Sequence, residues 1–231
     1  MKDLIVFDMD GVLVDVHDSY RAAIQATVKH FTGGEPSHAE IQDWKNRGGW
    51  NDDWQLSHRM IQERGGSATY ETVVDYFQGI FHGDGTNGLM MRERWLAVDG
   101  LFDRLARSHR LAVFTGRLRS EAHLTLRRFE AMIFDPVIGS DDVTRTKPDP
   151  EGLLKIRGSV EHGKCWYVGD TVDDARASSA AKIPFIGIAA PSNIRYEEVV
   201  RLLREEGAVA VLDDINALFT VIGEQAIAEN S

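Results

Sequence analysis

Short, uninterrupted apolar runs recur along this chain at intervals that suit a sheet with helices between its strands. Apolar and polar positions do not alternate within them, which is typical of parallel strands that are buried on both faces. We predict six such strands, over residues 4–7, 110–114, 132–139, 165–169, 184–189 and 208–212.

The stretches between the later strands carry apolar residues at helical spacing. The predicted helices cover residues 120–132, 173–183 and 193–207. In the first of them, the spacing places Leu124, Leu126, Phe129 and Met132 along one face. Strands that alternate with helices predict an α/β fold with a doubly wound parallel sheet.

Residues 16–92 interrupt this alternation. Several helical stretches follow one another there with no strand between them, which indicates a separate small helical bundle. The bundle is an insertion after the first strand. We therefore divide the chain into an α/β core of residues 1–15 and 93–231 and an α-helical insertion of residues 16–92.

Composition and charge narrow the range of partners. The formal charge of −10 over 231 residues argues against binding to nucleic acid or to a membrane surface, because both need a basic footprint. The single cysteine, Cys165, excludes an intrachain disulfide and a cysteine zinc site. The N-terminus lacks the apolar region of a signal peptide and no apolar run approaches transmembrane length, so we expect a cytoplasmic protein.

Polar side chains follow four of the predicted strands directly or after a short loop. In an open parallel sheet, ligands bind beyond the carboxyl ends of the strands, so these side chains should meet at one site. In chain order they are Asp8 and Asp10; Thr115, Gly116 and Arg117; Lys147; and Asp170, Asp173 and Asp174.

Carboxylates from the first and fourth strands could share a hard cation. Magnesium takes oxygen ligands, usually one or two carboxylates together with water and substrate phosphate. A bound cation would also offset the repulsion between neighbouring carboxylates. The sequence therefore predicts a Mg²⁺ site at this edge of the sheet.

Four short segments carry a family resemblance. The stretches "DMDGVLVD", "FTGR", "KPDP" and "GDTVDD" resemble, in order and approximate spacing, the four motifs of the haloacid dehalogenase superfamily. The likeness is to its helical-cap phosphatases, the phosphoglycolate-phosphatase-like group, and the insertion lies where that group carries its cap. The resemblance implies a Rossmann-like core with a cap domain and hydrolysis of a small-molecule phosphate ester.

The resemblance also implies roles for the residues that match the motifs. Asp8 would be the nucleophile that forms an aspartyl-phosphate, and Asp10 the general acid and later the base. Magnesium would be held by the Asp8 carboxylate, the Asp10 carbonyl and Asp170, with Asp174 in the outer shell. Thr115 and the Gly116 amide would bind phosphoryl oxygens, and Lys147 would bridge Asp8 and the phosphate.

Several of these residues have simpler explanations. Thr115 could cap a helix, which is compatible with phosphate binding, and Asp173 is best explained by the preference for acids at a helix N-terminus. After the threonine, relatives often have an asparagine and then a lysine, whereas this chain has Gly116 and Arg117. Arg117 would either contact substrate or pair with a carboxylate.

The stretch "WKNRGGWNDDW", residues 44–54, interrupts the helices of the insertion and is a candidate specificity loop. We predict that Arg47, Trp50 and Asn51 face the substrate, whereas Trp44 and Trp54 pack between helices. A guanidinium binds carboxylate or phosphate in a two-pronged manner, so Arg47 suggests a substrate with an anionic distal group.

Three other functions compete with a magnesium-dependent phosphatase. A phosphomutase of the same superfamily would transfer the phosphoryl group to a sugar hydroxyl. Haloacid dehalogenation needs neither an acid for the leaving halide nor a metal, so Asp10 and the acidic fourth motif argue against it. A non-catalytic binding or regulatory module is disfavoured because all the candidate catalytic groups are present.

Overall fold

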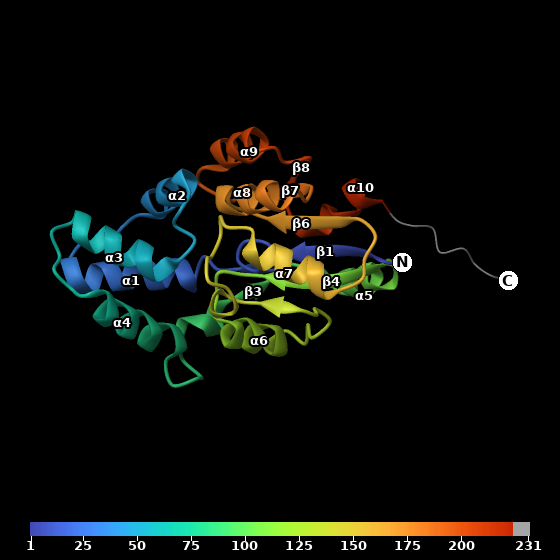
Figure 1. Ribbon diagram of the computed structural model, residues 1–231. Helices are drawn as coiled ribbons and strands as arrows, with labels where there is room; N and C mark the ends of the chain where they lie inside the picture. Colours follow the sequence, from blue (N-terminus) through green and yellow to red (C-terminus); the bar gives the residue numbers. More distant parts are fainter. Residues whose placement is uncertain (224–231) are drawn as a thin grey trace.

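A six-stranded parallel sheet forms the centre of the computed structural model, which describes residues 1–223 (Figure 1). The strand order is β5-β4-β1-β6-β7-β8, so the chain begins in the middle of the sheet and extends it in both directions. This confirms the predicted doubly wound fold. The strands are β1 (Asp3–Phe7), β4 (His109–Phe114), β5 (Val137–Ile138), β6 (Cys165–Gly169), β7 (Phe185–Ile188) and β8 (Ala210–Leu212).

The register of the central strands aligns their carboxyl ends. Phe7 of β1 is paired with Val113 of β4 on one side and with Val168 of β6 on the other. The residues that follow these strands therefore emerge at nearly the same level. Leu4 to Phe7 are fully buried, which explains why the first strand is apolar without alternation.

Helices cover both faces of the sheet. Apolar residues of α5 (Leu101–Ser108), α6 (Arg119–Arg128) and the segment from η3 (Ile215–Ala217) to α10 (Phe219–Ile222) pack on one face. Those of α7 (Glu151–Ser159), α8 (Val172–Ala181) and α9 (Tyr196–Glu205) pack on the other face. The short helix η2 (Ser140–Asp142) follows β5.

A helical cap lies beyond the carboxyl ends of the strands, which point toward it in Figure 1. Its helices share an apolar cluster of their own. They are α1 (Tyr20–Thr32), α2 (His38–Arg47), α3 (Asp53–Glu63), α4 (Tyr70–His82) and η1 (Leu89–Arg92). The chain enters the cap through β2 (Val14–Asp15) and leaves it through β3 (Arg94–Trp95), and these two strands pair antiparallel.

Two predictions of local structure are wrong. The run 132–139 contributes only two strand residues, because it forms an edge strand just after Pro136, which has no amide hydrogen to donate. The predicted apolar face of α6 is also incorrect: Leu126 is buried, but Leu124 and Met132 are 41% and 51% exposed.

Within residues 1–223, no helix has both the length and the apolar character needed to cross a lipid bilayer.

Candidate active site

The loop after β1 brings two aspartates to the edge of the sheet. The chain coils tightly there, and the Met9 carbonyl accepts hydrogen bonds from three amides, those of Val12, Leu13 and Val14. Gly11 has a φ of +72°, and a Cβ at this position would lie 2.1 Å from Asp170 Oδ2. Only glycine meets both requirements without strain. Asp8 and Asp10 both line the cavity between core and cap.

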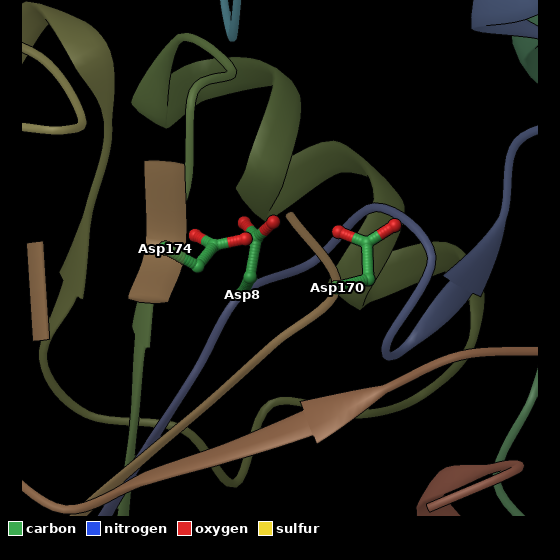
Figure 2. Close-up of side chains that lie close together, drawn as sticks. All are labelled: Asp8, Asp170 and Asp174. Carbon is green, nitrogen blue, oxygen red and sulfur yellow. The ribbon is translucent and has the colours of Figure 1, made fainter. Parts of the chain in front are cut away.

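Three carboxylates from two segments of the core form a compact cluster. Oxygens of Asp8, Asp170 and Asp174 all lie within 4.8 Å of one another. Asp170 directly follows β6, and Asp174 lies in the first turn of α8. Figure 2 shows the carboxylates of Asp8 and Asp174 side by side, with that of Asp170 next to them.

Lys147 lies between two of these carboxylates. Its Nζ is 2.8 Å from Asp8 Oδ1 and 2.7 Å from Asp174 Oδ1, and the residue is only 3% exposed. Burial disfavours the charge of Lys147, but Asp174 and Asp8 outweigh this effect and raise its pKa. The lysine is therefore a fixed positive charge beside Asp8.

Protein donors surround Asp174. Its Oδ1 accepts hydrogen bonds from Tyr167 at 2.6 Å and from Lys147, and its Oδ2 accepts hydrogen bonds from the amide and the hydroxyl of Thr171. Burial opposes ionisation, but Lys147 and the other donors hold the pKa of Asp174 below its usual value. These donors orient Asp174 to hold Lys147 and leave Asp8 and Asp170 freer to accept a cation.

Of the three clustered carboxylates, Asp8 and Asp170 are the two whose negative charge the surrounding protein groups offset less than that of Asp174. Burial raises the pKa of Asp8 to about 7; Lys147 opposes this rise, and Asp174 and Asp10 add to it. Burial, together with Asp174 and Asp8, raises the pKa of Asp170 well above its usual value. A divalent cation between Asp8 and Asp170 would offset this crowding. Carboxylate oxygens are ligands that Mg²⁺ prefers, so the donor set fits that ion.

The segment after β4 provides Thr115, Gly116 and Arg117. Thr115 is buried, and it does not cap the next helix, because the N-cap of α6 is Leu118. Gly116 lines the cavity, and a Cβ added to it would lie 2.3 Å from Asn51 Nδ2 of the cap. The loop after β4 is therefore in close contact with the cap.

Arg117 pairs with carboxylates. Its Nε donates a 2.7 Å hydrogen bond to Asp10 Oδ1, and its Nη2 lies 2.8 Å from Glu93 Oε1. Of the two roles considered from the sequence, these contacts favour pairing with a carboxylate.

The three candidate residues of the cap loop separate in the structure. Asn51 lines the cavity. Arg47 is exposed, and its guanidinium lies 4.6 Å from the ring centroid of Trp44. Trp50 packs edge-on against the same tryptophan. Trp44 and Trp54 pack against the apolar cluster of the cap, as predicted, and so does Trp50; Trp54 also lines the cavity. Of the three predicted residues, Asn51 is the one that lines the cavity, whereas the guanidinium of Arg47 lies over Trp44.

Further residues line the cavity, some inside the predicted specificity loop of residues 44–54 and others outside it. Lys45 of α2 forms an ion pair with Asp53 of α3, and both side chains are largely buried. Glu121 of α6 accepts hydrogen bonds from Tyr20 and Gln78 of the cap. The cavity of about 80 Å³ is lined by these residues except Gln78, and by Arg21 and Asp52. Lys45, Asp52 and Asp53 belong to the predicted specificity loop, whereas Tyr20, Arg21 and Glu121 lie outside every motif identified from the sequence.

Asp173 joins the core to the cap. Both of its carboxylate oxygens lie 2.8 Å from the amide nitrogen of Gly49 in the cap loop. Nearby, Arg195 of the core pairs with Asp43 of α2. Asp173 therefore does more than begin α8: it also contacts the cap loop that carries Asn51.

A parallel sheet with a helical cap and clustered carboxylates beyond its central strands defines the class: an α/β protein with an acidic site between core and cap. The comparison with known families gives the particular family. Residues 5–188 match the haloacid dehalogenase-like hydrolases, and the chain belongs to this family.

The chain is also similar to individual proteins. The chain is 26% identical to a phosphoglycolate phosphatase of Psychrobacter arcticus, over 94% of each sequence. It is 38% identical to an imidazoleglycerol-phosphate dehydratase of Phytophthora nicotianae, over 90% of this chain but only 49%, about half, of that protein. A haloacid dehalogenase-like protein of Agrobacterium tumefaciens has the same fold, with a TM-score of 0.72, 20% identity and coverage of 96% and 98% of the two chains.

Proposed function

We propose that this hydrolase is a magnesium-dependent phosphatase that cleaves a small phosphate monoester through an aspartyl-phosphate on Asp8. The observation that carries the proposal is the position of Asp8. It lies beside the buried cation Lys147 and within 4.8 Å of a second under-compensated carboxylate, Asp170, at the floor of the cavity beneath the cap. This is an arrangement for nucleophilic attack on a dianion by a carboxylate.

The reaction has two steps in this proposal. An oxygen of Asp8 attacks phosphorus, the bond from phosphorus to the ester oxygen breaks, and Asp10 gives its proton to the departing oxygen. Asp10 then takes a proton from water, which attacks the phosphorus of the aspartyl-phosphate and releases phosphate and free Asp8. The result is one ester and one water converted to an alcohol and phosphate.

Other residues position the phosphoryl group and compensate its charge. Lys147 stays paired with Asp8 and Asp174 and faces the phosphoryl oxygens, while Thr115 and the Gly116 amide donate hydrogen bonds to them. Asp8, Asp170 and the Asp10 carbonyl would hold magnesium, which would supply further charge neutralisation when bound. Asp174 contributes indirectly, because its ion pair holds Lys147 in position.

In this proposal the cap determines which substrates can enter the cavity. We propose residues 16–92 as the cap domain and Asn51 as a contact to the leaving group, because Asn51 lines the cavity next to Gly116. A cavity of only about 80 Å³ between core and cap favours a small phosphorylated metabolite over a large one.

The test is phosphate release from p-nitrophenyl phosphate with magnesium present and then chelated. We expect release with magnesium, loss of it on chelation, and recovery on adding the ion back. The Asp8→Asn variant, which keeps the size of the side chain, should fall to the background rate. Equal rates for wild type and Asp8→Asn would contradict the proposal.

A further inference from the structure

Arg117 occupies an unusual position for a charged side chain next to an active site. It is only 3% exposed, and its guanidinium lies 4.6 Å from the ring centroid of Tyr20 at the start of the cap. The buried charge must be compensated by the protein, because an unpaired cation at such a depth is costly.

The compensation comes from two carboxylates. Nε of Arg117 donates to Asp10 Oδ1 at 2.7 Å, Nη2 contacts the same oxygen, and Nη2 also lies 2.8 Å from Glu93 Oε1. Nη1 donates to Thr125 at 2.8 Å. All three nitrogens are therefore engaged within the protein, which leaves the guanidinium poorly suited to bind substrate.

The contacts to Asp10 leave one of its oxygens available. Both Arg117 nitrogens bind Oδ1, and within residues 1–223 no protein group bonds to Oδ2. The Asp10 side chain is 30% exposed and lines the cavity. Arg117 thus fixes the rotation of the carboxyl group while Oδ2 can exchange a proton with the substrate.

Glu93 is held in place by several groups. It is 4% exposed, its Oε2 accepts a 3.0 Å hydrogen bond from Thr125, and Arg128 Nη1 lies 3.6 Å from the same oxygen. Glu93 directly precedes β3, where the chain leaves the cap. Its charge balances that of Arg117 and fixes the position of the guanidinium that binds Asp10.

We propose that Arg117 is a positioning residue: supported by Glu93, it aligns Asp10 for proton transfer to the leaving oxygen. This inference rests on the proposed phosphatase function. A residue that only stabilises the fold would affect all substrates alike. A residue that positions the general acid matters most when the leaving oxygen is strongly basic, because a weakly basic one departs without a proton.

The experiment compares kcat/KM for phenyl phosphate and p-nitrophenyl phosphate, which are similar in shape but differ in leaving-group basicity. We expect Arg117→Met to lower the value for phenyl phosphate by about 100-fold and that for p-nitrophenyl phosphate by less than about 10-fold. The ratio of the two values is measured on one preparation, so partial unfolding of the variant cancels from it.

Two controls make the result specific. Arg128→Met removes an arginine that contacts Glu93 but not Asp10, and it should leave the ratio at the wild-type value. In an Asp10→Asn background, which shifts the ratio by itself, adding Arg117→Met should not shift it further.

An Arg117→Met ratio equal to that of an active wild type would overturn the inference and leave the proposed function standing. A further shift in the Asp10→Asn background would also overturn it. If the wild type releases phosphate from neither ester, the proposed function fails and this inference fails with it.

Discussion

Asp170 is a carboxylic acid whose ionisation the folded protein opposes strongly. Burial is the main cause, followed by the charges of Asp174 and Asp8. A folded-state pKa above the unfolded value means that the folded protein binds this proton more tightly than the unfolded chain does. The contribution of Asp170 to stability without metal therefore falls as pH rises above about 4, the unfolded value.

The negative charges gathered around Asp170 predict that magnesium stabilises the folded protein at neutral pH. At magnesium concentrations of about 100 times the dissociation constant, we expect the melting temperature of the wild type to rise by about 5 °C or more. The Asp170→Asn variant should lose this rise. Without metal it should melt no lower than the wild type, because the substitution removes a penalised charge. Thermal unfolding monitored by circular dichroism measures both quantities.

The Asp173→Asn variant is the matched control, because Asp173 lies on the same turn but contacts the cap loop. It should keep the response to magnesium. A full magnesium response in Asp170→Asn would show that this carboxylate does not hold the ion.

For single residues, the sequence predicted the site correctly where a residue follows a strand of the parallel sheet. Asp8, Lys147 and Asp170 follow strands directly or after a short loop, and parallel strands bring such positions together whatever the details of packing. Glu93 and Glu121 have no such marker. Their importance comes from contacts with residues 24 or more positions away, such as Arg117 and Tyr20, and the sequence around them resembles an ordinary charged surface.

Among the structural elements, the loop after β1 has the strictest requirements. The positive φ of Gly11 costs a residue with a side chain about 1–2 kcal/mol, and the added Cβ would also collide with Asp170. We predict that Gly11→Ala lowers the free energy of unfolding by at least this amount and weakens the magnesium-induced rise in melting temperature.

Gly100 offers a matched comparison for Gly11. It has a similar φ of +78°, but a Cβ there would meet nothing within 4 Å. Gly100→Ala should therefore show the backbone cost alone, with the magnesium response intact. Equal magnesium responses in the two variants would argue against contact between the loop and the metal site.

The α6 helix explains one failure of the sequence-based reasoning. Its inward positions include Glu121 and Thr125, and both are buried because they bind Tyr20 and Arg117. A search for an apolar face instead selected Leu124, which is exposed. Helical periodicity identified the helix correctly. Its buried face could not be predicted from apolar residues, because polar residues that contact Tyr20 and Arg117 occupy part of that face.

At the scale of the whole molecule, charge limits the choice of substrate. The cavity is lined by more carboxylates than cations; the carboxylates are Asp8, Asp10, Asp52, Asp53, Glu121 and Asp170, and the cations are Arg21, Lys45 and Arg117. Lys45 and Arg117 are already paired with carboxylates, and Arg21 is hydrogen-bonded to Gln42. We therefore expect a substrate that carries a second anionic group besides its phosphate to gain little binding energy from that group in this cavity.

A series of two-carbon monophosphates tests this point. We expect kcat/KM to be about 10-fold or more higher for phosphoethanolamine than for 2-phosphoglycolate, with 2-hydroxyethyl phosphate between them. This difference corresponds to about 1.4 kcal/mol. Asp53→Asn should narrow it, because that variant removes one carboxylate from the cavity wall. Hydrolysis of 2-phosphoglycolate as efficiently as phosphoethanolamine would contradict the charge argument.

The pairing of β2 with β3 has a consequence for how this molecule could be rebuilt. Because Val14 lies opposite Trp95 and Asp15 opposite Arg94, the two ends of the cap are adjacent. A short glycine-containing turn could join them and complete a β-hairpin. The whole cap could thus be replaced by a different one while the sheet kept its connectivity. Such a replacement would change the substrate selectivity without altering the residues at the ends of the sheet strands.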